Sequence, residues 1–180
     1  MPEREKKQIV AESETLRFRS TMEKDLDYVV SLEQAEENKR FIMPWAWEQH
    51  REALSNPDVA HLMIETVEEN SVIGFVLLAG LENIHQNIEL RRIVIATKGI
   101  GYGKKAVQLI KKLAFEEWKA HRLWLDAFVY NLVARHLYAT HGFVMEGTLR
   151  ECYKVGGRFE SLVIMSILDT EYFGKPSSIS

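Results

Sequence analysis

The stretch from Ile93 to Trp118 reads IVIATKGIGYGKKAVQLIKKLAFEEW and decides how the rest of the chain is interpreted. It begins with β-branched apolar residues, which favour a strand. Glycine then stands at alternate positions, 99, 101 and 103, and an amphipathic helical pattern follows. The first N–H groups of a helix lack intrahelical partners and carry the positive end of its dipole. Because glycine leaves those groups uncovered, the stretch predicts a cradle for a phosphate or diphosphate.

Composition and charge bound the class of protein. The chain has 180 residues, 46% of them hydrophobic and 27% charged, which is enough for one buried core. The net charge of −3 argues against a nucleic-acid-binding protein, which needs a basic surface. No apolar run approaches the roughly 20 residues of a membrane span, so no membrane partner is expected. Since Cys152 is the single cysteine, no internal disulfide can form, and we expect a reducing, cytoplasmic location.

Residue periodicity predicts the order of the elements. We expect one strand, two helical regions, three strands, a helix, a strand, a helix and two final strands that pair as a hairpin across Gly156-Gly157. The strand–helix–strand unit from Asn87 to Tyr130 should place its strands parallel, by a right-handed crossover. The predicted fold is therefore α/β (α+β), with a mixed, mainly antiparallel central sheet of about seven strands and helices on both faces. We expect a flexible N-terminal tail over 1–13, a single domain over 14–170 and a C-terminal tail over 171–180.

Two better-known phosphate loops do not fit the glycine-rich stretch. A Walker A loop that ended on Gly103-Lys104 would need Gly at 98 and Ser or Thr at 105, and both positions are Lys. The dinucleotide fingerprint would need Gly at 104 or 106, where Lys104 and Ala106 stand. The antiparallel strands that precede the stretch also differ from a doubly wound nucleotide-binding fold.

The pattern that fits is Lys98-x-x-Gly101-x-Gly103. It resembles the Arg/Gln-x-x-Gly-x-Gly/Ala pyrophosphate loop of the GNAT superfamily of N-acetyltransferases. The stretch RLWLDAFVYNLVARHLYATHGF is also similar to the second half of that family, where a strand leads to Asn131, a helix with Tyr138, and Gly-Phe. The resemblance covers about residues 15–169 and is closest to the ribosomal-protein and polyamine acetyltransferases. Lys98 departs from the family's Arg or Gln, and the preceding IATK lacks the family's frequent Pro.

The resemblance implies acetyl-CoA as the co-substrate. The backbone of the strand would pair with the pantetheine arm, the amides from Gly99 to Lys104 would hold the diphosphate, and Asn131 would hydrogen-bond the cofactor. An amide of the strand would also polarise the thioester carbonyl. The residues implied for cofactor contact are Ile93, Val94, Ile95, Lys98, Gly99, Ile100, Gly101, Tyr102, Gly103, Lys104 and Asn131.

Three residues are candidates for proton transfer. An aliphatic amine has a pKa near about 10, so a group must accept its proton at neutral pH. By resemblance, Tyr138 is the general acid that protonates or hydrogen-bonds the departing sulfur. Asp126 stands in an otherwise apolar strand, where desolvation would raise its pKa and make it a base; the alternative is a structural hydrogen bond or a pairing with Arg92 across the parallel strands. Glu89 is the reserve base, although its position in the alternation could point it to solvent.

Other stretches have ordinary interpretations beside functional ones. EQAEENKR is expected to be a solvated helix face, or to attract a cationic amine. Trp45 and Trp47 either wall the acceptor site or anchor a loop. His136 and His141 lack metal-ligand spacing, so we expect no metal.

The sequence thus predicts an acetyl-CoA-dependent N-acetyltransferase that uses direct attack by an amine in a ternary complex. The acceptor stays open among a protein N-terminus, a polyamine and another small amine. The alternatives are a non-catalytic acyl-CoA-binding regulatory module and a plain phosphate-binding scaffold. The C-terminal hairpin, with Phe159, offers an edge for a homodimer.

Overall fold

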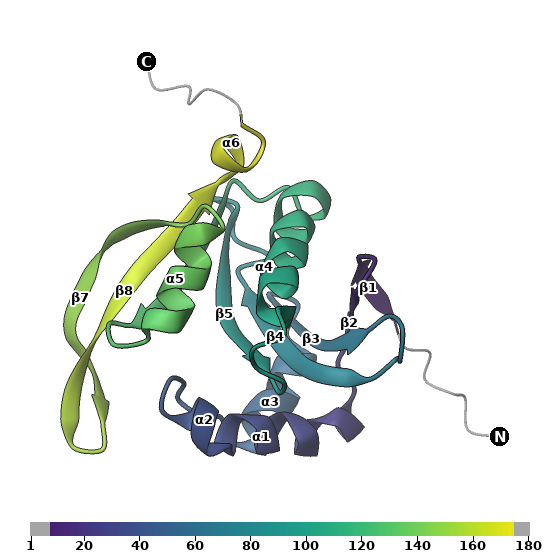
Figure 1. Cartoon of the computed structure of the whole chain (residues 1–180), viewed down its shortest axis with the longest axis horizontal. Helices are drawn as coiled ribbons and strands as arrows, with labels where there is room; N and C mark the ends of the chain where they lie inside the picture. The colour runs from purple at the N-terminus through teal and green to yellow at the C-terminus, as the bar shows by residue number, and fades with distance from the viewer. Residues whose placement is uncertain (1–7, 175–180) are drawn as a thin grey trace.

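A computed structural model describes residues 8–174 and contains one sheet of eight strands in the order β1-β2-β3-β4-β5-β6-β8-β7 (Figure 1). Neighbouring strands are antiparallel except β5 and β6, which are parallel as the sequence predicts. The strands are β1 (Ile9–Glu12), β2 (Leu16–Ser20), β3 (Val59–Thr66), β4 (Val72–Ala79), β5 (Asn87–Ile95), β6 (Arg122–Phe128), β7 (Val144–Val155) and β8 (Arg158–Leu168).

Helices cover both faces of this sheet, as predicted. Figure 1 shows α4 and α5 on the face turned to the viewer, while α1, α2 and α3 gather at the lower end of the sheet. The helical elements are η1 (Glu23–Asp25), α1 (Leu26–Gln34), α2 (Glu36–Lys39), α3 (Trp47–Leu54), α4 (Tyr102–Lys112) with a π-helical turn η2 (Leu113–Glu117), α5 (Leu132–Thr140) and α6 (Asp169–Tyr172).

The side chains of β4 pack alternately against the helices on the two faces of the sheet. Phe75 and Leu77 belong to a core cluster with Val29 and Leu32 of α1. The intervening Val76 and Leu78 belong to the larger core with α4 and α5. Successive side chains of a strand point to opposite faces, so β4 needs apolar residues at every position. The predicted α/β class with a mixed, mainly antiparallel sheet is therefore confirmed.

The centre of the sheet opens between β5 and β6. Their parallel pairing covers only Asn87 to Glu89 on β5 and ends at the pair Glu89 and Trp124. On its other side β5 stays paired with β4 as far as Ile95, with an irregularity next to Arg92. The two strands therefore diverge from Glu89 onward, which leaves one edge of β5 without a strand partner among residues 8–174.

The expected boundaries of the tails need correction. Residues 9–12 form β1, an edge strand paired with β2, so the predicted tail over 1–13 is wrong there and the sheet gains an eighth strand. Ile9 is 52% exposed, and such an edge strand leaves little burial pattern in the sequence. In the predicted tail over 171–180, Tyr172 is docked: its ring stacks on Phe115 and its hydroxyl donates to Glu116 Oε1 at 2.6 Å. Residues 1–7 and 175–180 lie outside the described part of the chain.

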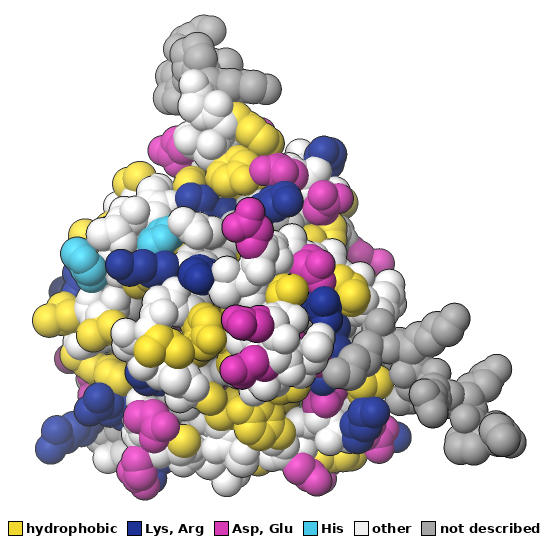
Figure 2. All heavy atoms as spheres, turned by 45° about the vertical axis from the view of Figure 1, so that its right-hand side comes forward, with side chains coloured by type: hydrophobic (Ala, Val, Ile, Leu, Met, Phe, Trp, Pro, Cys, Tyr) yellow, Lys and Arg dark blue, Asp and Glu magenta, His cyan; other side chains and the backbone are white. Residues whose placement is uncertain are grey.

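Charges of both signs are intermixed on the face that Figure 2 shows, with exposed hydrophobic side chains in small groups between them. Among the described residues, this face shows no extended region of one sign. Among the described residues, no helix is both long and apolar enough to cross a membrane.

Candidate active site

A cleft of about 670 Å³ occupies the gap between the diverging strands β5 and β6. It extends from the glycine-rich turn before α4 to the α2–α3 loop, residues 40–46, and is also lined by α5. The structure brings together in this cleft the predicted residues Glu89, Ile93, Val94, Ile95, Lys98, Gly99, Gly101, Tyr102, Gly103, Asp126, Asn131 and Tyr138. Ile100 and Lys104 are exposed and are not part of its lining.

The glycine-rich turn owes two of its glycines to backbone conformation. Gly99 and Gly101 have φ values of +81° and +88°, which strain any residue with a Cβ. A Cβ at either position would meet nothing within 4 Å, so crowding is not the reason for glycine. Gly101 is the N-cap of α4, and the first N–H groups of that helix face the end of the cleft. The residues therefore fit a diphosphate held by amides.

Lys98 is tied to the opposite wall of the cleft. Its Nζ donates to Asn38 Oδ1 at 2.9 Å, and the buried Asn38 donates from Nδ2 to the Leu32 carbonyl oxygen at 2.8 Å. Burial lowers the pKa of Lys98, and the nearby negative charge of Glu37 opposes that shift. Lys98 therefore links the glycine-rich turn to α2 as well as lining the cleft.

Asn131 has a structural function at the start of α5. Its Oδ1 accepts a hydrogen bond from the Ala134 N–H at 3.3 Å, which caps the helix. Asn131 also lines the cleft. The predicted contact with a cofactor and the observed cap are therefore compatible.

Tyr138 lies on α5 with a side chain that is only 6% exposed. Its ring packs against Phe143, with centroids 5.6 Å apart, and its hydroxyl has no hydrogen-bond partner among residues 8–174. Burial raises the pKa of Tyr138 well above 10, and the negative charge of Asp126 adds to the rise. At neutral pH the phenol keeps its proton and can donate a hydrogen bond into the cleft.

Asp126 of β6 is open to the cleft, whereas the sequence interpretation expected a buried side chain. The surrounding walls still remove enough water to raise its pKa above 3.8, Glu89 raises it further, and Arg91 lowers it. The alternative of an ion pair with Arg92 is wrong, because Arg92 pairs with Glu33. Asp126 has no hydrogen-bond or ion-pair partner in the described part of the chain and is available to a substrate.

The carboxylate of Glu89, the reserve candidate for the base, already forms an ion pair with Arg91. Its Oε2 accepts from Arg91 Nη2 at 2.7 Å, and its side chain is 20% exposed. It lines the cleft rather than pointing away from it. Its contribution is therefore a negative charge beside Asp126.

Glu33 overturns part of the expectation for EQAEENKR. Glu36 and Glu37 are exposed, as a solvated helix face requires, but Glu33 is completely buried. It accepts hydrogen bonds from Arg92 and from the Trp45 backbone N–H. The available signal was Arg92, which alternates with the apolar Val94 on a strand that is buried on both faces and so had to be buried with a partner.

The sequence interpretation also missed an aromatic cluster beside the α2–α3 loop. Tyr130 stacks on Phe128 at 5.1 Å between ring centroids and lies 6.2 Å from Phe41. Its hydroxyl donates to the Arg40 carbonyl oxygen at 2.9 Å. Trp45 lines the cleft, whereas Trp47 does not. Residues far apart in sequence build this wall, so no local motif marks it.

In the part of the chain that the structure describes, no three His, Cys, Asp or Glu residues come close enough to hold a metal ion. The groups that line the cleft include a tyrosine hydroxyl, a carboxylate with a raised pKa and the first turn of a helix. The predicted absence of a metal stays a prediction.

Residues 26–143 match the model of the family described as Acetyltransferase (GNAT) family. A spermidine N(1)-acetyltransferase of Vibrio cholerae is 31% identical over 115 residues, which cover 63% of this chain and 65% of that relative. The chain is similar in structure to the spermidine N-acetyltransferase of Vibrio cholerae in complex with CoA and spermine, with a TM-score of 0.79, 25% identity, and 88% of this chain and 98% of that chain covered. A dodecameric structure of the Vibrio cholerae enzyme gives a TM-score of 0.73 at 25% identity over 87% of this chain and 95% of that one.

Proposed function

The chain belongs to the acetyltransferase (GNAT) family, and from this membership we propose that it transfers an acetyl group from acetyl-CoA to a primary amine of a polyamine. The observation that carries the proposal is the divergence of β5 from β6. It creates a cleft with helix amides at one end and with Tyr138 and Asp126 beside its middle strands.

The unpaired edge of β5 is suited to the pantetheine arm of acetyl-CoA. Beyond Glu89 this edge has lost its pairing with β6, so the backbone of Ile93, Val94 and Ile95 can pair with the amides of an extended ligand. The arm would then run toward Gly99 and Gly101, where the amides at the start of α4 bind the diphosphate. Lys98 would add positive charge there.

Tyr138 and Asp126 supply the proton transfers. The amine nitrogen attacks the thioester carbonyl carbon, the carbon–sulfur bond breaks, and the proton of the amine passes to Asp126, whose raised pKa makes it a better base than a solvated carboxylate. The hydroxyl of Tyr138 donates a hydrogen bond to the leaving sulfur. Because the pKa of Tyr138 is raised, this hydrogen bond precedes any full transfer of its proton.

The acceptor end favours a cation. Asp126 lines the cleft without an ion-pair partner among the described residues, and the negative charge of Glu89 lies beside it. Phe41 and Phe128 line the cleft close by, and aromatic rings attract ammonium groups. A polyamine offers one amine to the thioester and a second cation to this wall. The spermidine acetyltransferases to which the chain is similar support this substrate class.

The test is thiol release from acetyl-CoA with spermidine, spermine, an N-terminal peptide or no amine. We expect release that depends on the polyamines and a loss of about 100-fold in kcat for Asp126→Asn. CoA binding without amine-dependent release would favour the acyl-CoA-binding module and contradict the proposal. Release with the peptide alone would contradict the polyamine as acceptor.

Assembly and location extend the proposal. We infer that several copies of the chain associate, and the dodecameric relative supports a homo-oligomer in general. The homodimer and the cytoplasmic location stay predictions.

A further inference from the structure

The α2–α3 loop is fixed to both of the diverging strands. Arg92 of β5 donates from Nη2 to the Met43 carbonyl oxygen at 2.8 Å. Tyr130, which follows β6, donates to the Arg40 carbonyl oxygen at 2.9 Å. Residues of this loop line the cleft themselves. These two hydrogen bonds therefore set the position of the loop relative to the strands that hold the reacting groups.

Glu33 of α1 holds the same loop at a third backbone atom. One carboxylate oxygen accepts a hydrogen bond from Arg92, and the other accepts one from the Trp45 N–H at 2.7 Å. Glu33 has no exposed surface and Arg92 has 9%. The guanidinium also lies over the Trp45 ring, 4.9 Å from its centroid. The ion pair thus contacts three groups of one loop: the Met43 carbonyl oxygen, the Trp45 N–H and the Trp45 indole ring.

Two buried histidines extend this pair into the core. His61 Nε2 lies 3.1 Å from His50 Nδ1, and His61 Nδ1 lies 2.8 Å from Thr21 Oγ1. Burial lowers the pKa of His61 to about 3, and the positive charge of Arg92 adds to this shift. His50 Nε2 faces Glu33 at 3.3 Å without hydrogen-bond geometry, and a proton on that nitrogen suits the carboxylate. His61 then donates to His50, and Thr21 donates to His61.

A buried ion pair is a weak way to gain stability, because apolar side chains of similar volume often stabilise as well or better. Here the charged groups bind backbone atoms of a loop, which apolar groups cannot do. We propose that Glu33 and Arg92 are positioning residues for the acceptor amine: they hold the α2–α3 loop so that a bound polyamine meets the thioester in a fixed geometry. This inference rests on the proposed acetyl transfer and assigns it residues beyond the reacting groups.

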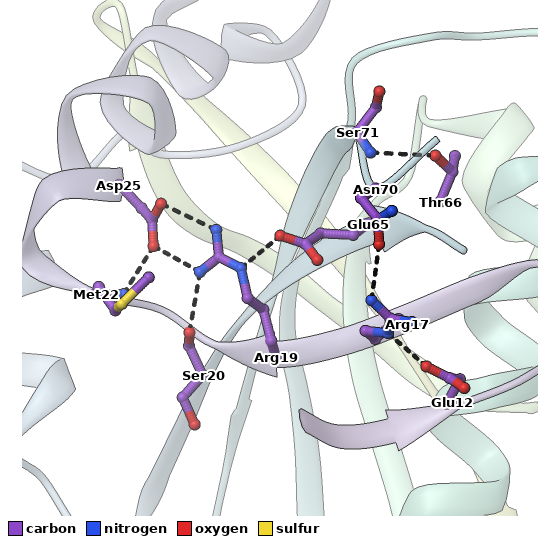
Figure 3. A network of polar contacts seen from close by, with 10 residues as sticks. All are labelled: Glu12, Arg17, Arg19, Ser20, Met22, Asp25, Glu65, Thr66, Asn70 and Ser71. Carbon is purple, nitrogen blue, oxygen red and sulfur yellow. Dashed lines mark hydrogen bonds and ion pairs between the residues drawn. The ribbon is translucent and has the colours of Figure 1, made fainter. Parts of the chain in front are cut away.

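The molecule contains a matched control in the network around Arg19, which Figure 3 shows between Asp25 and Glu65. Arg19 Nε donates to Glu65 Oε1 at 2.6 Å, and Arg19 Nη1 donates to Asp25 Oδ2 at 2.7 Å. Arg19 is 2% exposed and Glu65 1%. None of the three residues lines the cleft. Neutralising Glu65 therefore disturbs a buried arginine of the same kind without touching the α2–α3 loop.

The experiment compares steady-state kinetics of Glu33→Gln and Glu65→Gln with spermidine and acetyl-CoA, below the unfolding temperature of each variant. We expect Glu33→Gln to raise the KM for spermidine at least about tenfold and to leave the KM for acetyl-CoA within about twofold. Glu65→Gln should leave both constants unchanged. Tyr130→Phe removes one anchor of the loop with little risk to folding, and it should raise the KM for spermidine by about threefold.

The possible failures point to different conclusions. Wild-type protein without turnover contradicts the proposed function, and with it the positioning of the acceptor. Active wild type with equal constants for Glu33→Gln and Glu65→Gln overturns the positioning role alone. If Glu33→Gln does not fold, Tyr130→Phe decides: an unchanged KM for spermidine contradicts the inference.

Discussion

Arg19 and Arg92 are both buried arginines on strands, yet they have different surroundings. Arg19 faces two carboxylates, Asp25 and Glu65, and a backbone carbonyl, and it joins β2 to β3 and η1. Arg92 faces one carboxylate, a loop carbonyl and an aromatic ring. Only Arg92 borders the cleft. The comparison teaches that one kind of buried ion pair can join elements of the core at one place and fix the wall of a substrate cleft at another.

The charge balance of the two networks differs as well. Burial alone would raise the pKa of Asp25, but hydrogen bonds from Arg19 and from the Met22 N–H outweigh it and hold that pKa below 3.8. Around Arg92, the single carboxylate is backed by two buried histidines instead of a second anion. The Arg19 network therefore depends on its cation more strongly than the Arg92 network does.

Replacing each arginine in turn should change the free energy of unfolding more than any other substitution in the two networks. We expect Arg19→Met to lower the free energy of unfolding by about 3–5 kcal/mol, because it removes the cation that pairs with the buried Glu65 and the partly buried Asp25. Arg92→Met should cost less, since Arg92 pairs with one carboxylate and Arg19 with two. Urea unfolding at neutral pH measures both.

A second substitution separates lost attraction from unpaired charge. Glu33→Gln combined with Arg92→Met should recover part of the stability that Arg92→Met loses, because no buried charge is then left alone. Equal losses of unfolding free energy in Arg19→Met and Arg92→Met would contradict the proposed difference between the two networks.

Acid should weaken the two networks in different ranges of pH. The pKa of His61 is about 3 in the folded protein and about 6.5 when unfolded, so the unfolded state binds more protons between these values. Stability therefore falls as pH decreases from 6.5, with a slope of up to about 1.4 kcal/mol per pH unit from this residue. Asp25 has a lowered pKa, so its contribution persists above 3.8 and is lost below that.

The measurement is denaturant unfolding between pH 7 and pH 4.5 for wild type, His61→Asn and Asp25→Asn. His50, Arg92 and Asp25 are the charged or titratable groups that act on His61. We expect His61→Asn to flatten the dependence of stability on pH, and Asp25→Asn to leave the slope in this range as in wild type. A wild-type slope that persists in His61→Asn would assign the acid sensitivity to other groups.

Local patterns made most of the fold predictable. The run from Ile93 to Trp118 predicted a strand, a glycine turn and a helix, and the structure contains all three. The edge strand β1 was missed because its pairing uses backbone hydrogen bonds and buries little of Ile9. The family was recognisable for the same reason, since its loop and the Asn131–Tyr138 segment are continuous in sequence.

The ion pair that holds the α2–α3 loop was not predictable from local patterns. Glu33 and Arg92 are 59 positions apart, and neither belongs to a motif. The apolar residues around Arg92 indicated only that its charge needed a partner. The expected partner, Asp126, was wrong, because Arg92 pairs with Glu33. Long-range pairs of charged residues depend on how elements pack, which periodicity within one element does not describe.

Transfer of a bound acetyl group to spermidine in a single turnover is the most direct test of the cleft. The enzyme would be mixed in excess over acetyl-CoA, and acetylspermidine would be followed by rapid quench in wild type and in Tyr138→Phe. If this cleft is the active site, wild type converts the acetyl group at a rate that depends on spermidine, and Tyr138→Phe is slower by about 100-fold or more. Equal rates in the two proteins would contradict the role of Tyr138, and no acetylspermidine from wild type would contradict acetyl transfer to a polyamine.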